Sequence, residues 1–194
     1  MLSSCLLLAA SMVVGQTSAS SNYEHLKQIE WIIGEIEWTT EAEKEIPGVC
    51  EKGDKLCGWA EHEWVLNKNA IVVRLSIETA DKGIEVLSYQ GMIGWDAGET
   101  RIVSGGFNSI GSHSTSVWSC EGDKWLLKGK GVLGTGEKTT STLVISNIGA
   151  ESLTVQTVDR TEGDEALPDG PAIQLIRVDG SEDEDDEDEE DVDD

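Results

Sequence analysis

Hydrophobic residues recur at every second position along much of this chain. In the stretch 69–80, Ile71, Val73, Leu75 and Ile77 alternate with mostly polar side chains. A period of two, rich in β-branched residues, is typical of a strand with one buried face. Similar stretches follow one another between turns rich in Gly, Asp and Glu. The predicted strands are 35–41, 58–67, 69–80, 84–95, 101–109, 112–120, 124–133, 138–148, 151–160 and 172–178.

The connections between these strands are short, with the Gly/Pro-rich stretch EGDEALPDGP before the last one. Such connections cannot hold crossover helices, so neighbouring strands are expected to pair antiparallel. About ten consecutive strands close most economically into an up-and-down barrel, which removes exposed sheet edges. A β-sandwich is the alternative, but no long Greek-key connection is visible. The sequence therefore predicts an all-β barrel domain over 21–179.

The segment 26–38, LKQIEWIIGEIEW, precedes and enters the first strand. It begins with the spacing of a short amphipathic helix and changes to alternation after Gly34. We expect Gly34 to make a bend and the helical part to cover one open end of the barrel as a plug. The apolar face of this plug would consist of Leu26, Ile29, Trp31 and either Ile32 or Ile33.

Residues 1–20 have the layout of a secretory signal peptide. An apolar run over 6–14 is followed by small residues, with Thr17-Ser18-Ala19 as the cleavage site. No Lys or Arg precedes the run, and a buried helix is the alternative reading. The run is too short to span a bilayer. A secreted or periplasmic protein is the expectation.

The other end of the chain is strongly acidic. Twelve of the fourteen residues in SEDEDDEDEEDVDD, which starts at Ser181, are Asp or Glu. Such a block repels itself and cannot bury surface, so 180–194 is expected to be a disordered tail. Subtracting these twelve charges from the total of −24 leaves −12 on the rest of the chain. This acidity argues against nucleic acids and anionic membranes as partners.

Three cysteines follow the signal region. Cys50 and Cys57 enclose a six-residue stretch with a Gly-Asp turn, and a disulfide between them is the first choice in an exported chain. Cys120 would then be a buried thiol or an intermolecular partner. No CxxC or paired-histidine spacing is present, so no metal site is predicted.

Several segments together resemble the calycin superfamily, which includes lipocalins and lipocalin-like domains of exported bacterial proteins. The matching pieces are IEWIIGEIEW (29–38), NKNAIVVR (67–74), MIGWDAGETRIVS (92–104), GDKWLLKGKG (122–131) and IQLIR (173–177). One position differs, because Ile36 stands where lipocalins have a tryptophan. The resemblance implies that Arg177 lies across Trp31 or Trp38 at the closed end, as a structural cation–π contact.

No catalytic cluster is visible. A G-x-S-x-G motif is absent, and the serines beside His113 would point away from it on a strand. Haem-binding barrels share this architecture, and the resemblance implies a histidine ligand near the last strands. No histidine follows His113, so neither haem nor any other cofactor is predicted.

The chain has an unusual aromatic composition, with seven tryptophans but only one phenylalanine and two tyrosines. Most would fill the core, but some could line a cavity for a small apolar or amphipathic ligand. The predicted pocket residues are Trp64, Arg74, Gln90, Trp95, His113 and Thr115. We therefore expect a lipocalin-like binding module. The alternatives are an accessory interaction domain and, with less support, an enzyme using His62, His113 and Arg74.

If the protein is exported as expected, its signal region should be removed. Protein isolated from an exported fraction of its native source should lack the first ~19–20 residues, because signal peptidase cleaves after small residues. Intact-mass spectrometry checks this. Full-length chain recovered from the cytoplasm would contradict it.

Overall fold

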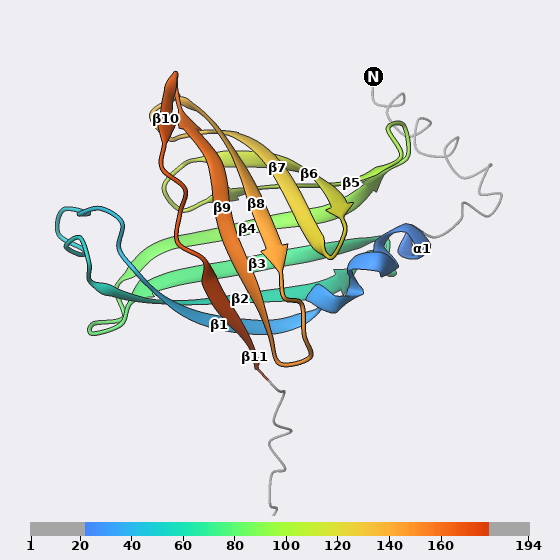
Figure 1. Cartoon of the computed structure of the whole chain (residues 1–194), viewed down its shortest axis with the longest axis horizontal. Helices are drawn as coiled ribbons and strands as arrows, with labels where there is room; N and C mark the ends of the chain where they lie inside the picture. Colours follow the sequence, from blue (N-terminus) through green and yellow to red (C-terminus); the bar gives the residue numbers. More distant parts are fainter. Residues whose placement is uncertain (1–21, 179–194) are drawn as a thin grey trace, which may run out of the picture.

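Strand pairing follows the chain order almost without interruption in the structure, a computed structural model that describes residues 22–178 (Figure 1). Each strand from β1 to β9 pairs antiparallel with the next, and β11 pairs with both β9 and β1. The result is a closed ten-stranded antiparallel barrel. Its strands are β1 (Gly34–Glu41), β2 (Lys55–Val65), β3 (Ala70–Thr79), β4 (Glu85–Asp96), β5 (Arg101–Asn108), β6 (His113–Glu121), β7 (Lys124–Val132), β8 (Lys138–Ser146), β9 (Ser152–Glu162) and β11 (Ile173–Val178).

These ten strands confirm the all-β barrel and agree with the predicted ranges to within a few residues. One strand was not predicted. β10 (Glu165–Leu167) lies within the Gly/Pro-rich stretch, outside the barrel, and pairs only with the last residues of β9. It is three residues long, too short for alternation to reveal. The predicted signal region and acidic tail lie outside the described residues.

A helical plug covers one end of the barrel, as predicted. It consists of α1 (Tyr23–Leu26) and the 3-10 turn η1 (Lys27–Ile32), which lie against the barrel end in Figure 1. Leu26 and Ile29 are fully buried, and Ile32 nearly so, in the main hydrophobic core. Trp31 and Ile33 pack against this core and stay half-buried. Gly34 has a φ of +109°, which supplies the bend into β1 because glycine lacks a Cβ.

The long β1–β2 connection forms a second, smaller core. Ala42 and Cys50 pack there with Leu56 of β2. Cys57 follows Leu56 and is exposed, because successive residues of a strand point to opposite faces. Cys50, Cys57 and Cys120 are all free thiols, so the expected Cys50–Cys57 disulfide is not present. Cys120 is exposed, contrary to the buried alternative.

Glycines inside the strands make room for aromatic rings that lie along the barrel wall. The Trp38 ring lies over Gly58, directly opposite it on β2. The Tyr89 hydroxyl lies over Gly91 and Gly106, on adjacent strands. A Cβ at any of these glycines would overlap the aromatic side chain beside it. None of the described helices is long and apolar enough to cross a membrane.

This close packing predicts a strong position dependence for glycine substitutions. Gly106→Ala should lower the free energy of unfolding by about 1–3 kcal/mol, because its Cβ would overlap the backbone carbonyl oxygen of Gln90, which cannot rotate away. Gly94→Ala is the matched control, since nothing lies within 4 Å of its added Cβ. Urea unfolding measures both. Equal losses of stability would contradict the packing described here.

Candidate functional site

The inward faces of the strands surround a cavity of about 410 Å³. Its walls are mainly apolar and come from strands all around the barrel. They include Ile36, Val73, Leu127, Leu143, Val155 and Leu175. Small residues such as Ala60, Ser104 and Ser116 also face this space, which is why it is hollow. Four polar side chains reach it, namely His62, Tyr89, Ser104 and Ser116.

His62 is the distinctive polar group of this cavity. It lies on β2 between the inward-facing Ala60 and Trp64, and pairs with Gly34 of β1 and Val73 of β3. Part of the side chain is accessible, but its Nδ1 atom is buried. Among the residues that the structure describes, Nδ1 is the one buried side-chain nitrogen or oxygen without a hydrogen-bond partner. Buried polar atoms without partners are uncommon in native proteins, so this atom calls for an explanation.

Burial also fixes the charge state of His62. Desolvation by the surrounding protein lowers its pKa to about 4, and the positive charge of Arg177 acts in the same direction. The carboxylate of Glu61 opposes these effects but is weaker. The imidazole is therefore neutral at pH 7, with one ring nitrogen able to donate a hydrogen bond and the other able to accept one.

Two other polar groups at the cavity, Ser104 and Tyr89, have protein partners. The indole Nε1–H of Trp118 donates to Ser104 Oγ over 2.9 Å. The hydroxyl of Tyr89 forms a hydrogen bond with the side chain of Ser114. Burial raises the Tyr89 pKa, and this effect is larger than the lowering by the hydrogen bond. His62 differs from these two groups because its buried Nδ1 has no protein partner.

Four of the predicted pocket residues do not face the cavity. The side chain of Arg74 lies on the outer surface, where its Nη1 binds Glu61 at 2.9 Å and Glu63 at 3.3 Å. Gln90 is paired with Arg74 on the neighbouring strand and is exposed. His113 and Thr115 are exposed as well, with His113 beside Phe107 at a ring distance of 5.7 Å.

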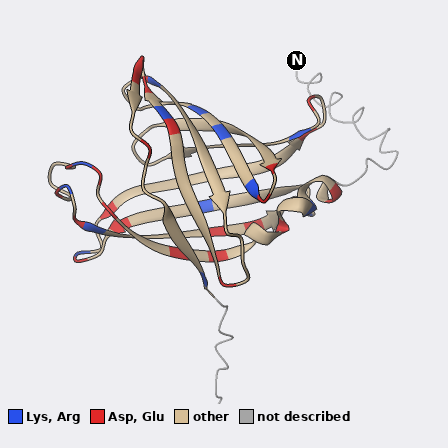
Figure 2. Cartoon of the chain, viewed as in Figure 1, with Lys and Arg blue, Asp and Glu red and all other residues tan. Residues whose placement is uncertain are grey.

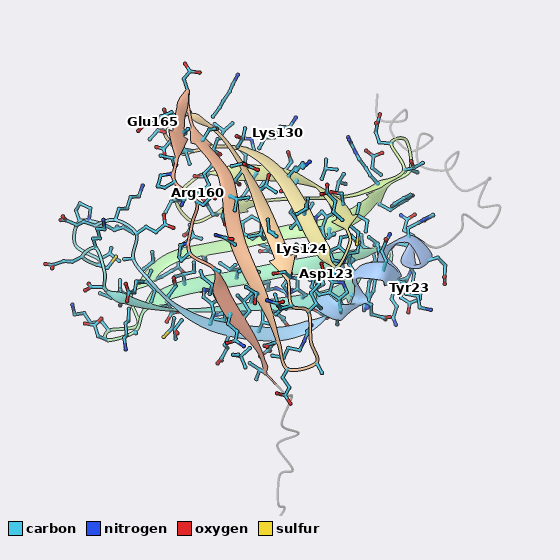
Figure 3. The ribbon with its side chains drawn as sticks, in the orientation of Figure 1. Tyr23, Asp123, Lys124, Lys130, Arg160 and Glu165 are labelled. Carbon is cyan, nitrogen blue, oxygen red and sulfur yellow. The ribbon has the colours of Figure 1, made fainter. Side chains whose placement is uncertain are left out.

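The other two predicted pocket residues face inward but fill the plug end. Trp64 contacts Tyr23 of α1, with ring centroids 5.3 Å apart, and Tyr23 is labelled in Figure 3. Trp95 stacks on His25 at 4.1 Å. The alternative catalytic trio does not come together either, because His62 faces inward while Arg74 and His113 face outward. The alternation Ala60, His62, Trp64 was the signal in the sequence that pointed His62 inward.

The expected contact of Arg177 with a tryptophan is not what the structure shows. The Nε–H of Arg177 donates to the Gly149 carbonyl over 3.2 Å, and the cation–π contacts of the described residues involve Lys27 and Lys68 over Tyr23. Trp31 instead lies near Trp125, with ring centroids 6.3 Å apart. Trp38 is four residues along β1 from Gly34, and therefore lies on the barrel wall and not at the plug.

Comparison with known proteins identifies the fold alone. No family model matches the chain, and no curated protein matches it. The crystal structure of Rv2717c from M. tuberculosis is similar, with a TM-score of 0.58 and 14% sequence identity. The match covers 79% of this chain and 96% of that one. This likeness shows a similar β-barrel fold. No group of His, Cys, Asp or Glu suited to a metal ion occurs within 22–178.

The low pKa of His62 predicts a pH-dependent stability. An unfolded histidine has a pKa of about 6.5, so between pH ~6.5 and ~4 the unfolded chain binds a proton that folded His62 does not. Stability is therefore lost as the pH falls through this window, by roughly 3 kcal/mol from this group. The drop in unfolding free energy from pH 7 to 4 should be smaller in His62→Phe by that amount. An unchanged drop would contradict the burial of His62.

Proposed function

We propose that this protein is a binding module that holds one small, mainly apolar molecule inside the barrel, oriented by a hydrogen bond to His62. The observation that carries the proposal is an apolar cavity lined by the neutral, partly accessible imidazole of His62. The cavity volume of about 410 Å³ lies within the ~300–1,000 Å³ of typical ligand pockets. Apolar walls supply affinity by removing ligand surface from water.

The chemistry of His62 narrows the ligand. Because the imidazole is neutral near pH 7, it suits an uncharged hydroxyl, amide or amine better than an ionised group. A ligand without such a group would cover the imidazole without pairing it, and an unsatisfied buried polar atom costs ~1–3 kcal/mol. The module would therefore select molecules with an apolar body and one neutral polar group.

The proposal includes a location outside the cytoplasm, for which the support is the composition of residues 1–20. A barrel that encloses an apolar molecule suits an aqueous exterior, where such a molecule dissolves poorly. The acidic character of the chain, with a net charge of −24, would keep the carrier soluble and away from anionic surfaces.

A dye titration tests this proposal. N-phenyl-1-naphthylamine is apolar and has one N–H group, and it should gain fluorescence on entering the barrel. Val73→Phe should weaken binding strongly, because Val73 faces the cavity next to His62, as its pairing partner on β3. His62→Phe should weaken it by about tenfold, the equivalent of one hydrogen bond to a buried group.

The matched control is His113→Phe, which changes an exposed histidine on the outer surface and should leave the affinity unchanged. Thermal unfolding of each variant checks that the barrel is intact. Dye binding that is equally strong in Val73→Phe and the wild-type protein would rule out the cavity as the binding site.

A further inference from the structure

One edge of the barrel wall is left without a partner. β1 continues to Glu41, and β2 pairs with it along its whole length. On its other side β11 pairs with β1 only at Glu35–Glu37. Within the described part of the chain, no strand covers Trp38–Glu41 on this side. An uncovered edge presents backbone groups that can pair with another extended chain.

The open edge directs particular backbone groups outward. The Ala42 N–H donates to the Asp54 carbonyl over 2.9 Å, on the β2 side. Backbone groups of successive strand residues point to opposite edges, so those of Thr39 and Glu41 point to the open edge. The backbone N–H of Arg177 donates to the carbonyl of Glu151 over 2.8 Å, on the side away from β1. The backbone groups of β11 therefore alternate between its two edges in the same way.

The chain itself does not fill the gap, because the segment before β11 is fastened to β9. The Gly170 N–H donates to the Thr157 carbonyl over 2.8 Å, and Gln156 Nε2 donates to the Gly170 carbonyl over 3.1 Å. Pro171 has no N–H to offer. Arg160 of β9, labelled in Figure 3, binds Glu43 after β1 through contacts of 2.9 and 3.2 Å, which ties the two sides together.

A groove of about 950 Å³ therefore lies along the open edge, between β1 and the start of β11. Three carboxylates, Glu37, Glu41 and Glu78, line it against one cation, Lys55. Acidic residues along β1 are visible in Figure 2. Trp59 and Ile176 flank Glu37 on the neighbouring strands and are 42% and 48% exposed. The groove thus offers backbone pairing, negative charge and apolar surface together.

We propose that this groove binds an extended peptide segment of a protein partner, which adds as a strand to β1 and carries alternating basic and apolar side chains. Basic side chains would point outward to Glu37, Glu41 and Glu78, and the alternate apolar ones inward to Trp38 and Ile173. Charge disfavours the other occupants. A second copy of this chain carries a net charge of −24, so an acidic groove would repel it. The groove would also repel the acidic segment 180–194 of the same chain.

The test uses the full chain and a capped KVKVKVKV peptide. Cys57 lines the groove and is exposed, whereas Cys50 is buried. In a background with Cys5→Ser and Cys120→Ser, reaction of Cys57 with a thiol reagent reports occupancy of the groove. We expect the peptide to slow this reaction in a saturable way. The acidic peptide EVEVEVEV and a KVKVKVKV peptide with alternate N-methylated amides should not.

Two pairs of variants test the mode of binding. Thr39→Pro removes an edge N–H while leaving the β2 ladder intact, and should weaken peptide binding about fivefold or more, the equivalent of one net hydrogen bond. Thr39→Val keeps the N–H and should bind normally. Glu41→Lys should weaken binding, whereas Glu99→Lys, with the same change of net charge in a distant turn, should not. Thermal unfolding confirms that each variant folds.

Several results would overturn the proposal. They are the absence of Cys57 protection by KVKVKVKV, equal protection by the N-methylated or acidic peptide, and unchanged binding by Thr39→Pro. Self-association in light scattering that Thr39→Pro abolishes would identify a second copy as the occupant instead. None of these outcomes depends on dye binding inside the barrel, so this proposal and the proposed function can fail separately.

Discussion

The antiparallel pairing of β11 with both β9 and β1 is the constraint on which the rest of the structure depends. It closes the sheet, and closure fixes which residue of every strand points inward. His62 points into the cavity and Arg74 out of it because each is held in that register. The same closing strand is short, and its three-residue pairing with β1 leaves the open edge beyond Glu37. Cavity and groove are thus two consequences of one closure.

The interior is filled unevenly, and this unevenness makes a binding site. At the plug end, Leu26 and Ile29 belong to the core against which Trp64 and Trp95 pack, so side chains fill the space there. Further along, small side chains such as Ala60 and Ser104 face the axis, so the barrel stays hollow. A closed barrel of this kind holds a ligand when its inward side chains are too small to meet. The hollow part is also where His62 lies.

Most of the fold could be predicted from the alternation of hydrophobic residues, which a half-buried strand imposes directly on its sequence. The plug could be predicted because Leu26, Ile29 and Gly34 combine helical spacing with a bend. The pocket residues could not, since polar residues such as Gln90 and His113 were assigned to the inside without knowing each strand's register. The predicted Cys50–Cys57 disulfide was wrong for a related reason. Leu56 packs with Cys50 in the smaller core, and Cys57, the next residue of the strand, points to the opposite face. The groove arises because the first residues of β11 pair with β9 and not with β1, which no local pattern encodes.

The central claim is that a ligand inside the barrel pairs with the imidazole of His62. Nitrogen-15 NMR of histidine-labelled protein observes the ring nitrogens directly, before and after saturation with N-phenyl-1-naphthylamine at pH 7. The account predicts that a ring-nitrogen resonance of His62 moves to the position of a hydrogen-bonded nitrogen, while His25 and His113 keep theirs. A saturated protein in which the His62 resonance stays in place would contradict it.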